Sequence, residues 1–339
     1  MNDRSDWTRR DFIRAAGAAG GALLMANAHG EGSPSSPRDW LHGVSDIHVH
    51  AAPDTKARAI DELSFAREAW QAGYRSIMFK SNDWSCHDRA FLIRQALPQF
   101  ECFGSLCMNR VHGDRVNVYA AEQAIKTSGR YCRCIWMPTL DAAYPHAVEK
   151  RPGKGIPVLD DTGRVLPEVV RVMEICAEAD IIFATGHSSS VESIVMAEKA
   201  RNVGVGKFVV THANSLIWKM TPDQIRKCID LGAFIEYCYL PVLWGPGTGL
   251  PDFAPMSGAE FAAFAALAPE SSFITTDLGQ RNMPHPLEGM RACILELLNA
   301  GMSQRDMDRM LRANPAWLMG LTGEDVTGLS HSVTNPDLS

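Results

Sequence analysis

The chain has 339 residues, of which 46% are hydrophobic and 21% are charged, the balance of a globular protein that can bury a large core. This composition excludes a disordered or fibrous chain. The formal net charge of −6 and the lack of a long basic run argue against a binder of nucleic acids or acidic membranes, because such partners require clustered lysines and arginines.

The N-terminal segment has the features of an export signal. The pair Arg9-Arg10 stands ahead of a mildly apolar stretch from Ala15 to Met25, which resembles a twin-arginine signal. The small residues that end at Ala28 suit a signal peptidase, so we expect cleavage after Ala28. The apolar stretch is too short for a stable membrane anchor. We therefore expect the chain to engage the twin-arginine export machinery and to be periplasmic or secreted.

The rest of the chain is expected to form one domain. We predict a signal peptide over 1–28, a linker rich in glycine, serine and proline over 29–40, a barrel domain over 41–322 and a C-terminal tail over 323–339. No further internal repeat or low-complexity tract suggests another boundary.

Nine cysteines stand at positions 86, 102, 107, 132, 134, 176, 228, 238 and 293, an odd number that fits no disulfide framework. The CxxC spacing of a zinc or redox motif is absent. Most of the cysteines are therefore expected to be buried thiols. Free thiols agree with folding in the reducing cytoplasm before export, which the twin-arginine resemblance implies.

One sequence pattern repeats along the expected domain: a short aliphatic run, a loop and a segment with helical spacing. The expected strands are 45–50, 75–80, 101–107, 131–137, 180–186, 206–212, 232–238 and 272–277. Helices are expected between them, including 60–71, 221–231 and 286–300, and a glycine follows each of these three.

This alternation predicts the fold class. Strands as apolar as 181–184 require a parallel sheet that helices cover, and eight such units in one domain predict a (β/α)8 TIM barrel. A doubly wound sheet is the alternative, but no GxGxxG fingerprint follows the first strand. The glycine-rich run 245–249 lacks the lysine of a phosphate loop, so we expect a simple loop after strand seven.

Histidine and aspartate residues close four of the expected strands. His48 and His50 end the first strand, and because side chains alternate along a strand, both face the same side. His187, His212 and Asp277 follow strands five, six and eight. In a barrel, these C-terminal strand ends form the floor of the active site. Imidazole and carboxylate ligands there predict a site for one or two divalent metal ions, with zinc the expected metal.

The pattern of HxH on strand one, histidine on strands five and six, and aspartate on strand eight resembles the metal signature of the amidohydrolase superfamily. The resemblance covers essentially the whole mature chain. The run 312–321, with its Asn-Pro-Ala sequence, is similar to the closing helix of many members. The runs 48–80 and 277–280 are similar to a little-characterised branch of the superfamily.

The resemblance implies a role for each strand-end residue. His48, His50 and His187 are expected to bind metal, and Asp277 is expected to bind metal and act as the general base. His212 is expected to be either a ligand of a second metal or a catalytic donor to the substrate oxygen.

Strand four departs from the family pattern. Binuclear relatives carry a lysine or glutamate there that bridges two metals, whereas residues 131–138 contain neither. Lys80 ends strand two and can reach the same space, either as a carbamylated metal bridge or as a cation for the substrate. A buried lysine must be paired or neutral. The alternative is a salt bridge at the barrel rim, to Asp54 or Asp83.

Several loop residues are candidates for substrate contacts. Arg110 and Arg281, after strands three and eight, can clamp a carboxylate or phosphate, and Trp84 can line the pocket. The polar segment 141–166 is a candidate lid. Residues 188–190 are serines that we expect to cap a helix, because no GxSxG nucleophile elbow is present.

Together these features predict a metal-dependent hydrolase of the amidohydrolase type, which cleaves an amide, lactone or ester of a small molecule with a metal-activated water. A metal-dependent decarboxylase of an aromatic acid is the second interpretation, because it would give Arg110 or Arg281 an acid to bind. A non-catalytic barrel that binds a metal or small molecule is the third. The expected partner is a small-molecule substrate, and assembly into a homo-oligomer is left open.

Overall fold

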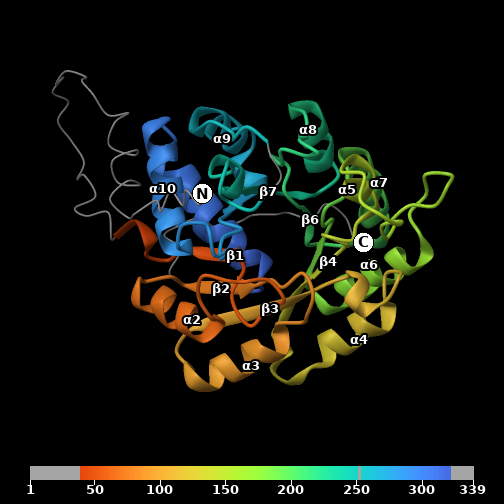
Figure 1. The fold of residues 1–339 in the computed structure, drawn as a ribbon, viewed down its shortest axis with the longest axis horizontal. Coiled ribbons are helices and arrows are strands. Elements are labelled where there is room, and N and C mark those ends of the chain that lie inside the picture. Colours follow the sequence, from red (N-terminus) through yellow and green to blue (C-terminus); the bar gives the residue numbers. More distant parts are fainter. Residues whose placement is uncertain (1–38, 251–252, 322–339) are drawn as a thin grey trace, which may run out of the picture. The chain divides into compact units, whose positions relative to one another are not determined.

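The computed structural model describes residues 39–250 and 253–321, which fold as a (β/α)8 barrel (Figure 1). All eight expected strands are present and pair in parallel, in the order of the sequence. They are β1 Ser45–Val49, β2 Ser76–Phe79, β3 Glu101–Cys107, β4 Cys132–Trp136, β5 Ile182–Ala184, β6 Phe208–Val210, β7 Phe234–Cys238 and β8 Ser272–Thr275.

Helices alternate with these strands: α2 packs on β2, α3 on β3 and α4 on β4, and Figure 1 shows these three helices along one side of the barrel. The α-helices are α2 Glu62–Gln71, α3 His87–Ala96, α4 Val118–Lys126, α5 Ala143–Val148, α6 Pro167–Ala179, α7 Ser190–Val203, α8 Pro222–Asp230, α9 Gly258–Ala265, α10 Pro286–Asn299, α11 Gln304–Asp308 and α12 Asn314–Leu318. Short 3-10 turns span Asp39–Leu41, Arg110–His112, Ser128–Arg130, Leu240–Val242 and Pro269–Ser271, and a π-helical turn spans Arg309–Ala313.

Hydrogen bonds between the first and last strand ends close the barrel. The backbone N–H of Asp277 donates to the carbonyl of His48 at 3.0 Å, and the N–H of His50 donates to the carbonyl of Leu278 at 2.8 Å. The register of β1 against β2 shifts between Asp46 and Val49. The seam between β1 and β8 therefore runs directly through the predicted metal ligands.

Alternation along the strands produces two apolar layers. In β4, Cys134 and Trp136 belong to a cluster inside the barrel, whereas Ile135 and Met137, which directly follows the strand, belong to the larger cluster between strands and helices. The inner cluster also contains Leu318 of α12 and Met319, which follows it. The expected closing helix thus packs its apolar side against the interior of the barrel.

Asn314 anchors this C-terminal helix. Its amide donates to the carbonyls of Pro269, Glu270 and Ser272, the last at 2.6 Å, at the start of β8. The conformation of the last helix is thereby tied to the last strand.

Local sequence signals for the other elements are confirmed where the structure describes them. Ser189 caps α7 in a reciprocal capping box with Glu192, and all nine cysteines are buried free thiols. The run 245–249 is a loop after β7.

Among the described residues no helix has the length and apolarity needed to cross a bilayer. The predicted export signal, most of the linker and the C-terminal tail lie outside the described residues, so export remains a prediction.

Gly186 illustrates how backbone packing fixes a site residue. It precedes His187, has φ of +63°, and a Cβ there would lie 2.3 Å from the carbonyl oxygen of Met137. We predict that Gly186→Ala lowers the free energy of unfolding by roughly 2–5 kcal/mol, because left-handed strain and a backbone clash add together.

Urea denaturation measures this loss, with Gly204→Ala as the matched control. Gly204 also has a positive φ, of +85°, but has open space around its Cβ position. The control should lose only about 1–2 kcal/mol. Equal losses in the two variants would contradict the proposed clash at Gly186.

Candidate metal centre and its cavity

The predicted ligands of strands one and eight meet at a single carboxylate oxygen. Asp277 Oδ1 lies 3.0 Å from His48 Nε2 and 3.1 Å from His50 Nε2. These three side chains are buried, and their ligand atoms all lie within 4.8 Å of one another. The prediction that His48 and His50 face the same side is therefore confirmed.

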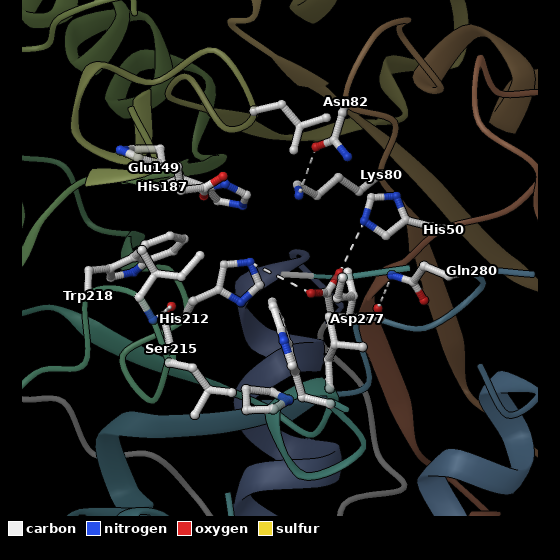
Figure 2. A pocket seen from close by; sticks show the side chains of 18 of the residues that line it. His50, Lys80, Asn82, Glu149, His187, His212, Ser215, Trp218, Asp277 and Gln280 are labelled. Carbon is white, nitrogen blue, oxygen red and sulfur yellow. Dashed lines mark hydrogen bonds and ion pairs between the residues drawn. The ribbon is translucent and has the colours of Figure 1, made fainter. Parts of the chain in front are cut away.

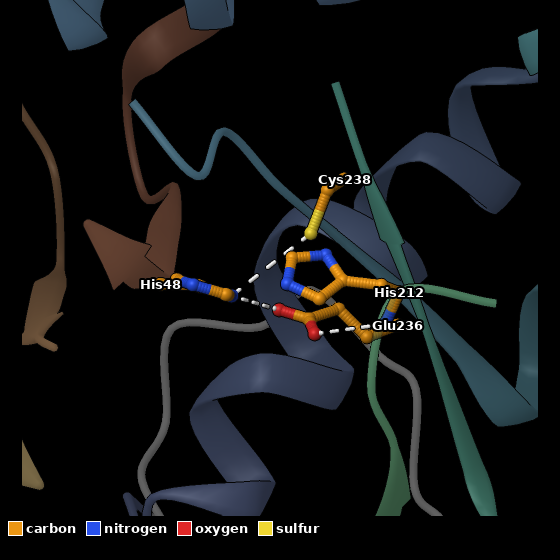
Figure 3. Close-up of side chains that lie close together, drawn as sticks. All are labelled: His48, His212, Glu236 and Cys238. Atoms are coloured by element: carbon orange, nitrogen blue, oxygen red, sulfur yellow. Dashed lines mark hydrogen bonds and ion pairs between the residues drawn. The ribbon is translucent and has the colours of Figure 1, made fainter. Parts of the chain in front are cut away.

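Glu236 of β7 was not predicted, and it orients the ring of His48 (Figure 3). Its Oε1 lies 2.8 Å from His48 Nδ1 and accepts a hydrogen bond from Thr275 Oγ1 at 3.0 Å, while Oε2 accepts from the backbone N–H of His212 at 3.3 Å. Burial opposes the charge of Glu236, but the His48 imidazole beside it lowers the pKa of Glu236 to about 2. Burial opposes a charge on His48, but Asp277 and Glu236 raise the pKa of its imidazole above the usual value. Glu236 accepts the Nδ1 proton, and a metal ion at Nε2 would take the place of the proton there.

This arrangement leaves one buried nitrogen without a hydrogen bond. His48 Nε2 is fully buried and has no hydrogen-bond partner of suitable geometry, although it lies 3.0 Å from Asp277 Oδ1. A lone-pair nitrogen facing a carboxylate oxygen at that distance is unfavourable unless a cation or proton stands between them. Ligands that share one ion at about 2.0–2.2 Å are separated by about this distance. The donor set therefore fits a divalent metal.

The charge state of the neighbouring groups also suits a cation. Burial opposes ionisation of Asp277, but the His48 imidazole holds the pKa of Asp277 well below its usual range. Burial lowers the pKa of His212 to about 4 and lowers those of His50 and His187 well below their usual value. These three rings are therefore neutral near pH 7, as metal ligands must be.

Arg58 sets the orientation of His50. Its Nη2 lies 3.2 Å from His50 Nδ1 and also donates to Asp54 Oδ2 at 2.9 Å. Because a guanidinium can only donate, Nδ1 accepts here and Nε2 carries the proton directed at Asp277. Binding of a metal ion at Nε2 requires this proton to move to Nδ1. Arg58 then loses its hydrogen bond to His50 and keeps the one to Asp54.

Cys238 completes a second cluster around His48, with His212 and Glu236 (Figure 3). Burial raises the pKa of Cys238 well above its usual value, so the side chain is a thiol rather than a thiolate. Both oxygens of Glu236 already accept hydrogen bonds. This cluster thus supports the ring of His48, and the open ligand atoms are those around Asp277.

His187 and His212 face the same cavity from β5 and β6 (Figure 2). His212 Nε2 lies 3.9 Å from Asp277 Oδ2, and the ring of His187 stands 5.2 Å from that of His212 and 4.9 Å from that of Trp218. His187 is not part of the close cluster with His48, so its role as a ligand stays a prediction. His212 and Asp277 both have left-handed φ values, of +52° and +53°. Such strain in non-glycine residues is typical of functional sites.

The cavity above these residues has a volume of about 180 Å³. Its polar side carries Lys56, Arg58, Lys80, Asn82, Glu149 and Arg151, which come from loops after β1, β2 and β4. Its apolar side includes Leu216, Trp218, Leu240 and Trp244, from loops after β6 and β7. The candidate lid, 141–166, supplies part of the lining, and its motion stays a prediction.

The three predicted substrate contacts lie away from this lining. Arg110 donates to Asp114 and to the carbonyl of Lys154, Trp84 is 54% exposed, and Arg281 is exposed. None of them is among the described residues that line the cavity. Their roles stay predictions, and the structure brings other cations, Lys56 and Arg151, to the cavity.

Lys80 does not form the salt bridge that was considered for it. Its Nζ is buried and donates to Asn82 Oδ1 at 3.4 Å, with Trp136 stacked below at 5.2 Å from the ring centre. Asp54 instead pairs with Arg58, and Asp83 with Thr55. The physical reason is that Lys80 points inward over the barrel floor, whereas both aspartates belong to the rim.

A buried amide network holds Asn82 in place. Asn109 Nδ2 donates to Thr139 Oγ1 at 2.6 Å and to the Asn82 carbonyl at 2.7 Å, and Thr139 Oγ1 donates to Asn82 Oδ1 at 2.8 Å. Asn82 Oδ1 is therefore an acceptor on both sides, from Thr139 and from Lys80. The network ties the ends of β2, β3 and β4 together beneath the ammonium group.

We predict that Thr139→Val lowers the free energy of unfolding by about 1–3 kcal/mol, because it removes a fully buried hydroxyl that serves both neighbouring amides. Thermal or urea unfolding measures the change. The control is Thr162→Val, which removes the exposed hydroxyl that bonds Asp160 and should cost less than about 0.5 kcal/mol. A loss in Thr139→Val as small as in the control would contradict the network's contribution.

Several solved structures have the same fold. The chain matches an amidohydrolase from Pseudomonas aeruginosa with a TM-score of 0.56 and 12% identity, over 84% of this chain and 98% of that one. It matches a mutant organophosphorus hydrolase from Deinococcus radiodurans with a TM-score of 0.53 and 12% identity, over 82% and 93%. It matches a dihydroorotase with a TM-score of 0.52 and 13% identity, over 84% and 70%. At these identities the likeness shows the shared barrel fold.

Sequence comparison places the chain in a family. No curated protein matches it significantly. The model of a family of unknown function, DUF6282, matches residues 43–236, which run from just before β1 into β7. The matched region includes His48, His50, His187, His212 and Glu236, and it covers more than half of the chain. The chain therefore belongs to this family of unknown function, DUF6282.

Proposed function

We propose that this protein is a metal-dependent hydrolase of the amidohydrolase type, which cleaves an amide, lactone or ester of a small molecule. The observation that carries the proposal is the orphaned Nε2 of His48, buried beside His50 and Asp277 at the base of a cavity. Two structural neighbours, named an amidohydrolase and an organophosphorus hydrolase, support the same reaction class.

His48, His50 and Asp277 would hold a divalent ion, and His187 and His212 stand where they can complete its coordination or hold a second ion. Zinc is the metal we expect, because two imidazoles and a carboxylate form a typical zinc donor set. Such an ion lowers the pKa of a water molecule bound to it and polarises a carbonyl group.

The residues divide the proton transfers between them. Asp277 Oδ1 faces His48 and His50, whereas Oδ2 faces His212 at 3.9 Å and is free to accept a proton from the attacking water. The same oxygen can deliver that proton to the leaving group. The neutral ring of His212 can donate a hydrogen bond to the substrate oxygen.

Lys80 is better suited to bind substrate than to bridge metals. Its Nζ donates to an acceptor, Asn82 Oδ1, whose orientation Thr139 fixes, and it lies over the face of Trp136. A carbamylated lysine would carry a negative charge and could not make the cation–π contact with Trp136.

Metal content per chain tests the site directly. We expect at least one equivalent of metal in protein purified without chelator, lost in His48→Ala and retained in Lys80→Met. Circular dichroism checks that the variants fold. Absence of metal even after zinc is added back would favour a non-catalytic barrel, and a loss of metal in Lys80→Met would assign Lys80 to the metal site instead.

Activity follows with a panel of amides, lactones and esters. Asp277→Asn should lower kcat by at least about 100-fold, because it removes the general base. Carbon dioxide release in place of bond hydrolysis would replace the proposal by a decarboxylase.

The role of Glu236 is tested separately. We predict that Glu236→Gln weakens zinc binding about 10- to 100-fold, because the charge that fixes the His48 tautomer is lost. Competition with a chromophoric chelator measures the affinity. The control is Glu62→Gln, whose buried carboxylate pairs with Arg89 away from the cavity. Unchanged zinc affinity in Glu236→Gln would contradict a role for Glu236 in orienting the His48 ring.

A further inference from the structure

The cavity carries an excess of positive charge in an acidic protein. Four cationic side chains line it, Lys56, Arg58, Lys80 and Arg151, against the two carboxylates of Glu149 and Asp277. The whole chain has a formal net charge of −6. A bound metal ion would add to the positive charge of the cavity. The cavity lining is thus positively charged although the whole chain is negatively charged, and this favours the binding of anions.

Two of these cations already have carboxylate partners and two do not. Arg58 pairs with Asp54 at 2.9 Å, and Arg151 pairs with Glu149 at 2.7 Å. In the part of the chain that the structure describes, neither Lys56 nor Lys80 has a carboxylate within 4.0 Å. Lys56 is exposed at the mouth, whereas Lys80 is only 2% exposed.

The buried ammonium of Lys80 is the stronger case. Its hydrogen-bond partner is one amide oxygen at 3.4 Å, which leaves donor capacity on a charged group shielded from bulk water. Figure 2 shows this amine directed at the cavity opposite Asp277, with His50 beside it. A buried charge requires a compensating charge or several hydrogen bonds. An anionic group in the cavity would supply both.

The opposite wall has different chemistry. Leu216 and Trp218 follow β6, and Leu240 and Trp244 follow β7, and all four side chains line the cavity. A ligand that spans the cavity therefore meets apolar side chains at one end and ammonium groups at the other.

We propose that the substrate is a small amphipathic anion, in which a carboxylate close to the scissile carbonyl binds Lys80 and an apolar group packs against Trp218 and Trp244. Lys56 at the mouth attracts the anion as it enters. This inference rests on the proposed function for the bond that is cleaved, but binding of the anion does not require the reaction.

Isothermal titration calorimetry with two ligands of matched shape tests the proposal on the full protein as purified. 4-Phenylbutyrate carries the carboxylate, and 4-phenylbutyramide is its neutral counterpart. We expect the carboxylate to bind about tenfold more tightly, which corresponds to about 1.4 kcal/mol. Lys80→Met should reduce this preference to about one, with little change in the affinity for the amide, and Lys80→Arg should keep most of it.

Lys56→Gln and Lys227→Gln complete the set. Lys56→Gln should weaken carboxylate binding about threefold at low salt and less at high salt, as expected for an exposed charge. Lys227 lies on α8 and pairs with Glu198, so Lys227→Gln should bind both ligands as the wild type does. Metal content measured in each variant separates binding to Lys80 from binding to an ion.

The outcomes separate the two proposals. Equal affinity for the two ligands in the wild type, or a preference that survives in Lys80→Met, would overturn the anion site whether or not the protein hydrolyses anything. A preference that depends on Lys80, in a protein that cleaves no ester or amide, would support the anion site and reject only the hydrolase.

Discussion

The seam between the first and the last strand is the constraint on which the site depends. Two backbone hydrogen bonds join His48 to Asp277 and His50 to Leu278, so closure of the barrel also brings the candidate metal ligands together. Residues more than 220 positions apart in the chain are thereby placed 3.0–3.1 Å from one another. A barrel that failed to close would separate the imidazoles from the carboxylate and lose the site.

His48 stands between two carboxylates that have different tasks. Glu236 accepts hydrogen bonds from His48 Nδ1, Thr275 Oγ1 and the backbone N–H of His212. Both of its oxygens are therefore already occupied. Asp277 faces Nε2 from the cavity side and keeps Oδ2 open. One carboxylate therefore fixes the tautomer, and the other is available for chemistry.

The loops divide the cavity by chemistry as well as by position. Those after β1, β2 and β4 bring cations, and those after β6 and β7 bring aromatic and aliphatic side chains. The strand ends beneath them supply the candidate metal ligands. In barrels of this kind the loops vary while the strand ends are held by the closed sheet, so the proposed reaction centre and the proposed substrate preference would have separate structural origins.

The sequence by itself determined the eight strands, the parallel barrel, the side shared by His48 and His50, and the strand-end position of His187, His212 and Asp277. These features follow from local periodicity, which needs no long-range contact to be recognised. The sequence does not predict Glu236, because a single carboxylate within an apolar strand has no spacing pattern. Its place in a buried strand does imply, as for Lys80, that its charge must be paired or neutralised.

Only the tertiary structure decided which side chains meet. It directed Lys80 to Asn82 and Trp136 rather than to Asp54 or Asp83, and it brought Lys56 and Arg151 to the cavity, which Arg110, Arg281 and Trp84 do not line. The physical reason is that Lys80 and the loop side chains take their direction from packing between segments distant in sequence, whereas His48 and His50 take theirs from the alternation along the first strand.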